Sequence, residues 1–393
     1  MVYLFTAPCS AQVIWDRTQL DQVQSKTPST NTAETSTAEK QALVRLKALA
    51  DDALQHRPRS VTEKETKPPS GDIHDYQSFS RYWWPDPDKP DGLPYIRKDG
   101  VVNRKLLARG DRNKVGEFMD DVQVLALAGH FFKDKRYTQH AANMVRVWFL
   151  DEATKMNPNL DFGQGVPGRA HGRGPGIIDT RGFMFVLDSV ELFGSDTWPE
   201  EDQRALQAWF KEYVAWLQTD ELGLHEQKAK NNHGSWYAAQ VARYAVFSGD
   251  VELAKNTVEA AKQRIARQFD EHGNQSEEIK RTRSLHYSMF NLTALANLAQ
   301  VGDKVGVDLW EFTPEHGFGL QKSMSSLLPY LAGESRWPHP QLEPYTLSRS
   351  AHMTLRLFAQ EFSDPSFTDV VPQMKLRHPD LDYTVLLIGL LEK

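Results

Sequence analysis

The 393-residue sequence contains a single cysteine, Cys9. One thiol cannot form a disulfide within the chain, and it cannot supply the ligands of a cysteine zinc site or an iron–sulfur cluster. The chain also lacks any run near the ~18 apolar residues that span a bilayer, so we expect no membrane-embedded segment. Its charge is nearly balanced, because 46 Lys and Arg oppose 52 Asp and Glu for a net charge of −6. No global field attracts nucleic acid or anionic lipid, so a polyanionic ligand would need a local cluster of positive charge.

The first 40 residues differ in composition from the rest. Residues 1–16 contain a short apolar stretch followed by small residues, which resembles a weak or incomplete export signal but has no basic start. Residues 26–40 are rich in Ser and Thr and are predicted to form a flexible loop. We therefore divide the chain into an N-terminal segment, residues 1–40, and one domain, residues 41–393.

Helical periodicity dominates the remainder, and almost nothing alternates like a strand. Apolar residues recur at i, i+3/i+4 and i+7, which predicts helices at residues 41–56, 117–131, 136–150, 180–193, 200–218, 234–248, 251–270, 284–301, 319–332 and 347–362. A long succession of helical hairpins must stack into a solenoid or curve into a ring. The helical periodicity predicts an all-α fold. Because the sequence has no strict repeat, we expect a ring rather than a solenoid: a single (α/α) toroid, an incomplete α/α barrel, with a groove formed by loops and helix ends.

A segment from Pro68 to Asn103 interrupts this pattern. It is dense in Pro, Gly, Asp and aromatic residues and has neither the helical nor the strand period. Long structured loops of this kind are often functional. Its aromatic residues Tyr82, Trp83 and Trp84 suit stacking on sugar rings, although one of the tryptophans could equally fill the core.

A second polar island lies at residues 230–237, where an apolar helix begins. Asn and Ser at a helix start can cap free backbone N–H groups. The island holds more than a cap requires, because two asparagines are followed by a histidine and two aromatic residues. Its candidates for a binding or catalytic role are Asn231, Asn232, His233, Trp236 and Tyr237.

A third island, residues 277–288, packs three cations, two acids, a histidine and a tyrosine into twelve positions. It could be a solvated helix start with pairs such as Glu278 and Arg281. If the segment is helical, Arg283 and Tyr287 lie four residues apart and share a face. A neighbouring cation would then lower the pKa of Tyr287 toward general-base chemistry.

A glycine-rich basic stretch, residues 168–181, contains His171 and Arg181. It could bring Arg side chains and backbone N–H groups to an anion. The glycines could equally serve tight turns.

Together the islands supply His, Tyr, Asn and Arg, but no matched pair of acids. This set can cleave an acidic polysaccharide by β-elimination. The enzyme neutralises the uronate carboxylate, removes the C5 proton and protonates the departing O4.

Five motifs carry a resemblance to a known family. They are YWWPDPDKPDGLPYIRKDG, VWFLDEATKMNPNL, GRGPGIIDTR, KNNHGSWY and EEIKRTRSLHYSMFNL. In this order they resemble the alginate lyase superfamily of α/α-toroid polysaccharide lyases, and most closely polysaccharide lyase family 38, whose members act on alginate or glucuronan. The resemblance runs from about Pro68 to Trp310, and no motif is assigned from Glu311 onward. One departure is Phe162-Gly163-Gln164, where the family has Tyr-Ala-Gln, so one hydroxyl is missing from the expected groove.

The resemblance implies a catalytic set. Position by position it falls on Asn232, His233, Tyr287 and an arginine, for which the motif favours Arg281 and the helical-face argument favours Arg283. The tyrosine would act as acid and as base, while His233 would neutralise the carboxylate or act as base for the opposite stereochemistry. Residues expected to bind substrate are Tyr82, Trp83, Trp84, His171, Arg181, Asn231, Trp236, Tyr237, Glu278, Arg283 and His286.

The resemblance also implies the partner and the compartment. An acidic polysaccharide, alginate or glucuronan, is the expected substrate, with no nucleic acid or membrane partner. The protein is expected to be secreted or periplasmic, and no cofactor or catalytic metal is expected. Asp86, Asp88 and Asp91 could hold a structural cation, but a solvated turn is the preferred interpretation.

Two other functions compete with elimination. A glycoside hydrolase would need two carboxylates across the scissile bond; Glu277 and Glu278 would point to different faces, which leaves Asp179 with Glu278 as the remaining pair. A non-catalytic glycan-binding toroid would have little need of Asn232, His233 and Tyr287 together. A zinc site is disfavoured, because no His-Glu-x-x-His arrangement occurs.

Overall fold

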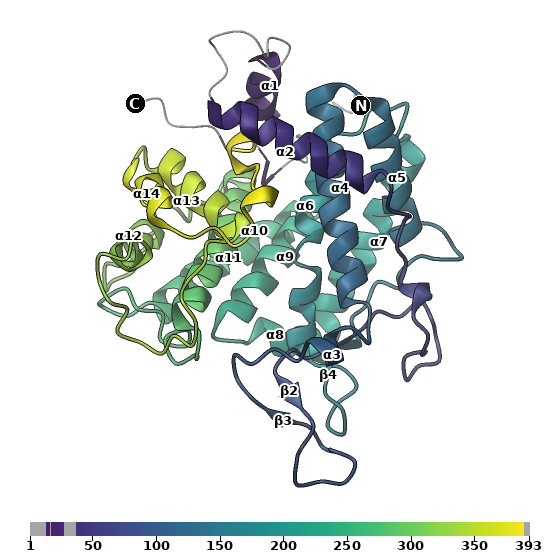
Figure 1. Ribbon diagram of the computed structural model, residues 1–393, viewed down its shortest axis with the longest axis horizontal. Coiled ribbons are helices and arrows are strands. Elements are labelled where there is room, and N and C mark those ends of the chain that lie inside the picture. Colours follow the sequence, from purple (N-terminus) through teal and green to yellow (C-terminus); the bar gives the residue numbers. More distant parts are fainter. Residues whose placement is uncertain (1–12, 16, 27–36, 389–393) are drawn as a thin grey trace, which may run out of the picture.

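The computed structural model describes residues 13–15, 17–26 and 37–388 (Figure 1). The α-helices of this part are α1 Arg17–Lys26, α2 Thr37–Ala53, α3 Arg104–Leu107, α4 Arg112–Phe132, α5 Lys135–Phe149, α6 Phe183–Val190, α7 Glu200–Thr219, α8 Glu221–Gln227, α9 Asn232–Ser248, α10 Val251–Gln268, α11 Ser284–Val305, α12 Leu320–Leu331, α13 Arg349–Glu361 and α14 Ser366–Asp369. Short 3₁₀ turns are η2 Val61–Glu63, η3 Gly174–Thr180, η4 Val371–Gln373, η5 Pro379–Leu381 and η6 Thr384–Leu386.

Each predicted helix is present, with ends that differ by a few residues. Local capping explains several of these ends: the side chains of Asp134, Asp250 and Ser348 accept hydrogen bonds from the first turns of α5, α10 and α13. Gly249 ends α9 in the left-handed conformation at φ 90°. The amphipathic stripes therefore predicted the helices well, whereas α1, α3, α8 and α14 were not predicted.

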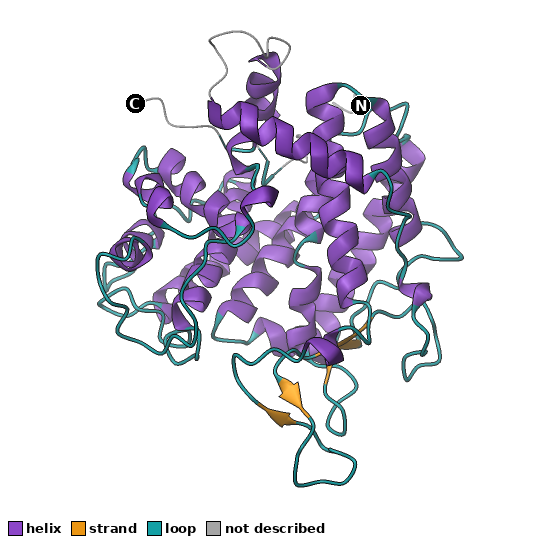
Figure 2. Cartoon of the chain, in the orientation of Figure 1, coloured by secondary structure: helices purple, strands orange, loops and turns teal. Residues whose placement is uncertain are grey.

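The helices pack side by side into a curved wall (Figures 1 and 2). Helix α9 lies at its centre, is buried along most of its length, and packs against α7, α10 and α11. Helix α4 packs against α2, α5 and α6. The predicted all-α toroid is confirmed; it is an incomplete ring rather than a closed barrel.

Two small sheets lie at one end of the helices (Figure 2). Strands β1 Gln77–Phe79 and β4 Phe162–Gly165 pair in parallel, and β2 Trp83–Trp84 and β3 Ile96–Arg97 pair antiparallel. All but β4 belong to the long loop predicted between residues 68 and 103. These pairings fix that loop against the helix ends, where the cavity described below opens.

A buried ion pair ties the segment before α1 to the ring. Asp188 on α6 accepts hydrogen bonds from the backbone N–H groups of residues 13–15, two of them at 2.7 Å. The same carboxylate accepts a hydrogen bond from Nη2 of Arg243, on α9, at 2.7 Å, and both side chains are fully buried. Residues 13–15 thus belong to the core of the toroid. Residues 1–12, most of the export-signal candidate, and most of the Ser/Thr-rich loop, residues 27–36, lie outside the described residues.

Among the described residues, no helix is both long enough and apolar enough to cross a membrane.

The Asp188–Arg243 pair predicts a large effect on stability. Arg243→Met leaves the Asp188 carboxylate buried without its counter-charge, so we expect the free energy of unfolding to fall by about 3–5 kcal/mol in urea titrations. The control is Arg204→Met, which removes an exposed pair with Glu200 and should cost less than about 1 kcal/mol. An equally small loss for Arg243→Met would show that the pair is dispensable.

Candidate active site

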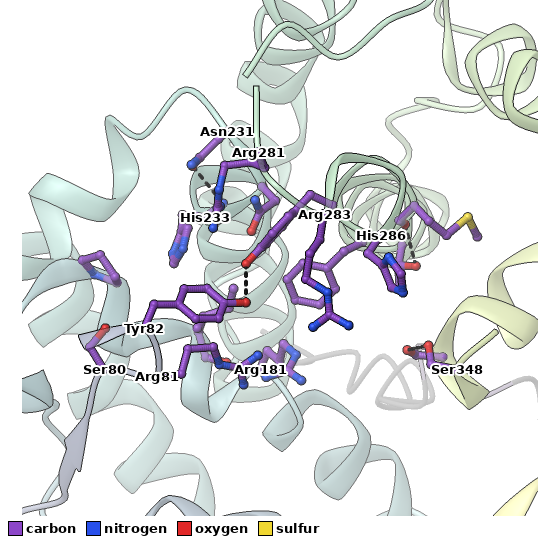
Figure 3. Close-up of a pocket in the computed structure, with 18 of the residues that line it drawn as sticks. Ser80, Arg81, Tyr82, Arg181, Asn231, His233, Arg281, Arg283, His286 and Ser348 are labelled. Carbon is purple, nitrogen blue, oxygen red and sulfur yellow. Dashed lines mark hydrogen bonds between the residues drawn. The ribbon is translucent and has the colours of Figure 1, made fainter. Parts of the chain in front are cut away.

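A cavity of about 570 Å³ opens where the loops meet the ends of α9 and α11 (Figure 3). Eight of its lining residues are arginine and, within the described part of the chain, none is Asp or Glu. The arginines are Arg81, Arg97, Arg112, Arg173, Arg181, Arg281, Arg283 and Arg377. In a chain of net charge −6, this is the local cluster of positive charge that a polyanionic ligand requires.

Two tyrosine hydroxyls meet in the cavity. The Tyr82 and Tyr287 oxygens are 2.8 Å apart, and the Arg281 guanidinium lies 3.8 Å from the centre of the Tyr287 ring. Burial and the neighbouring Tyr82 hydroxyl raise the pKa of Tyr287, against the opposing effect of Arg281. The phenol is therefore the resting form at neutral pH, ready to donate a proton.

A bidentate ion pair holds Arg281 in place. Its Nη2 and Nε donate to Asp99 at 2.8 and 3.2 Å, and Thr282 Oγ1 donates to the same carboxylate at 3.0 Å. Burial would raise the pKa of Asp99, but the bonds from Arg281 outweigh it and hold that pKa well below its usual range. Asp99 thus stays ionised and keeps the guanidinium plane against the Tyr287 ring.

The helical-face argument for Arg283 is wrong. Helix α11 begins at Ser284, with Arg283 as its N-cap, and residues 277–282 form turns. Arg281 therefore reaches Tyr287 from the preceding turn, whereas Arg283 lines the cavity and donates to Glu343.

Asn232, the first residue of α9, is held by a buried acid. Its backbone N–H donates to Glu278 at 2.6 Å, and Nδ2 donates to both carboxylate oxygens at 2.9 and 3.0 Å. Burial raises the pKa of Glu278, and these bonds from Asn232 oppose that shift. The Oδ1 atom of Asn232 has no hydrogen-bond partner within the described part of the chain. Glu278 was expected to bind substrate, but it lies behind Asn232 and does not line the cavity.

A second buried acid holds His233. The Nδ1 atom of His233 lies 2.6 Å from Oε1 of Glu226, on α8, and the Glu226 side chain is 2% exposed. A carboxylate accepts hydrogen bonds, so Nδ1 carries a proton and the ring orientation is fixed. Asn231 caps α9 by accepting from His233 N–H at 3.2 Å.

Arg181 enters the cavity without a carboxylate partner among the described residues. Its guanidinium lies beside the rings of Trp236 and Phe290, 5.7 and 5.4 Å from their centres, and the centres of the two rings are 5.0 Å apart. Burial, together with Arg112 and Arg81, lowers its pKa to about 10, so the group remains charged at neutral pH. A half-buried cation without a counter-ion among the described residues favours an anionic ligand.

The acid behind this part of the wall is Asp179. It forms an ion pair with Arg112 and accepts from Ser78 Oγ at 2.7 Å and from Gln164 Nε2 at 2.9 Å. Asp179 and Glu278 are both buried by such partners and neither lines the cavity, so they cannot flank a scissile bond.

Several predicted residues lie elsewhere. Trp84 lies outside the cavity and donates its indole N–H to Val101 O at 3.0 Å, and His171 is exposed and also outside. Tyr237 is buried and donates to Leu217 O at 2.9 Å, because the second turn of α9 faces the core. Trp236 is buried behind Arg181. The remaining predicted residues line the cavity, namely Tyr82, Trp83, Arg181, Asn231, Asn232, His233, Arg281, Arg283, His286 and Tyr287.

Sequence reasoning missed other residues of the wall. Ser80, Arg81, Arg97, Arg112, Gln164, Arg173, Tyr345 and Arg377 also line the cavity. Several of them had a signal, since Ser80 and Arg81 precede the aromatic motif, Arg97 lies within it, Arg173 lies in the glycine-rich stretch and Gln164 ends the departing tripeptide. Arg112, Tyr345 and Arg377 lie outside the motifs and are brought to the cavity only by the fold.

The glycine-rich stretch serves close packing of two backbones. A Cβ atom at Gly176 would lie 2.5 Å from the carbonyl carbon of Gly163. Glycine is therefore required for the two segments to touch, which brings Arg173 within 2.8 Å of Ser80 Oγ at the cavity wall.

No group of three or more His, Cys, Asp or Glu side chains gathers as metal ligands in the part of the chain described. Asp86 and Asp91 accept hydrogen bonds from the backbone N–H groups of Asp88 and Leu93, as in solvated turns.

Comparisons with known proteins identify the family and the fold. The sequence model of the alginate lyase family matches residues 60–337. An alginate lyase structure from Bacteroides ovatus is 34% identical, with a TM-score of 0.88 over 96% of this chain and 99% of that one. Alginate lyase A1-III from Sphingomonas species A1 is 15% identical, with a TM-score of 0.59 over 98% of this chain and 99% of that one. A variant of A1-III complexed with a tetrasaccharide is 14% identical, with a TM-score of 0.60 over 99% of this chain and 98% of that one. No curated protein matches.

The fold and the family match define the class: the protein is a polysaccharide lyase built on an α/α toroid. The chain belongs to the alginate lyase family, because that family's model covers well over half of it.

The Glu226–His233 contact predicts a loss of turnover when the acid is neutralised. Glu226→Gln keeps the shape but removes the charge that orients the imidazole, so we expect kcat to fall on the order of a hundredfold in a lyase assay. The matched control is Glu221→Gln, an exposed residue of the same helix, which should leave kcat unchanged. If Glu226→Gln kept full activity and fold, Glu226 would have no part in positioning His233.

Proposed function

We propose that this enzyme cleaves a 1,4-linked uronate polymer, alginate in the first place or else glucuronan, by β-elimination. The observation that carries the proposal is the composition of the cavity wall, which holds eight arginines and, among described residues, no acid. Such a wall attracts a polymer with one carboxylate per sugar. The names of the related structures, all alginate lyases, support the choice of alginate.

The first requirement of the reaction is neutralisation of the carboxylate next to C5. Arg281, fixed by Asp99, supplies a permanent charge beside Tyr287. His233 contributes an imidazole oriented by Glu226. Asn232 offers only the acceptor Oδ1, which can bond a protonated carboxyl group or a sugar hydroxyl, so neutralisation of the carboxylate rests on Arg281 and His233.

The second requirement is proton transfer at C5 and O4. Tyr287 loses its phenolic proton to solvent, removes the C5 proton as the phenolate, and passes that proton to the departing O4, which regenerates the phenolate. Its contact with Arg281 favours the phenolate needed for the first step, and its raised pKa favours the phenol needed for the second. The Tyr82 hydroxyl, 2.8 Å away, holds the Tyr287 hydroxyl in position.

Stereochemistry links these roles to the sugar. Mannuronate and glucuronate share their configurations at C4 and C5, so elimination from either is syn and one tyrosine can serve both steps. Guluronate requires anti elimination with a base on the opposite side, and His233 is the group available for it.

Two competing functions find less support. Hydrolysis needs two carboxylates across the scissile bond. The two candidates, Asp179 and Glu278, lie behind the cavity wall, where they are bonded to Arg112 and Asn232. A pure binding protein would have no use for the close packing of Arg281 on Tyr287.

We further propose that the enzyme acts outside the cytoplasm, in the periplasm or the medium, because a polymeric substrate is met there. Its partner is the acidic polysaccharide itself.

Ultraviolet absorbance tests the reaction directly. Elimination creates a C4–C5 double bond, so purified protein incubated with polymannuronate, polyguluronate or glucuronan should raise the absorbance on at least one polymer, and that polymer names the sugar. Reducing ends that appear without absorbance would replace elimination by hydrolysis.

Tyr287→Phe separates chemistry from binding. The variant keeps the ring stacked on Arg281 but lacks the hydroxyl, so we expect kcat to fall at least about a thousandfold while the substrate Kd changes less than about threefold. Calorimetry with an oligouronate and an absorbance assay give the two quantities. Loss of both binding and turnover would assign Tyr287 a structural role instead.

A further inference from the structure

Neighbouring residues of α11 face two regions of the cavity. Consecutive residues of a helix point about 100° apart, so Tyr287 meets Tyr82 while His286 faces the segment 341–345. Figure 3 shows Tyr82 on one side of Arg283, and His286 and Ser348 on the other. The cavity therefore extends beyond the group of residues assigned to proton transfer.

The wall of this second region comes from the C-terminal part of the chain. The segment after α12 returns to the start of α11, where Leu342 N–H donates to Thr282 O at 2.7 Å. Farther along, Arg377 N–H donates to Leu347 O at 2.8 Å. Residues 341–377 lie beyond the family match, which ends at residue 337.

The backbone fixes the hydrogen-bonding state of His286. Gln341 Oε1 accepts from Leu285 N–H at 3.1 Å, and Nε2 donates to Glu343 O at 2.6 Å, so the two ends of the amide are distinguished. The same Nε2 lies 2.6 Å from His286 Nδ1. Because Nδ1 accepts this bond, the ring proton is on Nε2.

His286 is consequently a neutral hydrogen-bond donor. Burial, with the nearby charges of Arg283 and Arg377, lowers its pKa to about 4. Its ring packs on Tyr345 at a centre distance of 4.7 Å, and its Nε2 has no partner among the described residues.

Positive charge exceeds negative charge around this donor. Arg283 pairs with Glu343, whose side chain is 57% exposed, and the Nε of Arg283 is buried with no partner in the described part of the chain. Arg377 donates to Thr346 Oγ1 at 3.3 Å and has no ion pair within the described residues. The hydroxyls of Ser348 and Ser350 complete the wall.

We propose that Arg283, His286 and Arg377 form a second carboxylate site, for a uronate residue other than the one that undergoes elimination. The proposal rests on the proposed function, because it extends the same cavity along the polymer. The reacting carboxylate already has Arg281 and His233. A polymer that carries a carboxylate on every sugar would place the next ones along the cavity, where this second set of donors lies.

The test is Arg377→Gln, assayed by absorbance on the polymer that the wild-type enzyme cleaves. Loss of a charged hydrogen-bond donor should raise KM about tenfold and leave kcat within about twofold. The matched control is Lys375→Gln. Lys375 lies two residues before Arg377, carries the same charge, is exposed and does not line the cavity, so this variant should leave both constants unchanged.

Chain length distinguishes a second site from the first. In the Tyr287→Phe background, calorimetry with oligouronates of increasing length should show that Arg377→Gln weakens only the longer ones. Equal weakening at every length, or none, would overturn the second site. Failure of the proposed function would look different, since the wild-type enzyme would then raise no absorbance on any uronate polymer.

Discussion

Four carboxylates behind the cavity wall, three of them buried and the fourth, Asp99, partly exposed, hold its polar side chains in place. Asp99 orients Arg281, Asp179 holds Arg112, Glu226 fixes the ring of His233, and Glu278 accepts from the backbone N–H and the side-chain amide of Asn232. Each acid has its partner within hydrogen-bond distance, which offsets the cost of burying the charge. The cavity surface thus carries cations and hydroxyls but, within the described residues, no acid, and the other polar features of the site depend on this separation.

The separation suits a reaction in which negative charge develops on the substrate. Donors held rigidly before the substrate arrives need no reorganisation when charge builds up on the carboxyl group. Acids exposed in the same cavity would repel a polyuronate and would weaken the field of the arginines. The tyrosine pair supplies the proton transfers within this field, and Arg281 links the two functions because it contacts both Asp99 and the Tyr287 ring.

The sequence predicted the helices because their burial leaves an apolar stripe, and it predicted Asn232 because an asparagine pair at a helix start exceeds what a cap needs. The helical-face argument for Arg283 failed, since no local signal placed the start of α11 at Ser284 rather than several residues earlier. Glu226 resembles any acidic residue of a short helix, and Arg377 is distant in sequence from the motifs. Their roles depend on tertiary packing, which one-dimensional patterns do not contain.

The measurement that tests the account most directly is the mass of the products from a defined oligouronate. Elimination cleaves the C4–O4 bond without consuming water, so the masses of the two fragments should add up to that of the substrate, and the fragment with the new non-reducing end should carry the unsaturation. Fragments that together weigh one water more than the substrate would show hydrolysis, and the assignment of Tyr287 and its arginine-lined cavity to elimination would then be contradicted.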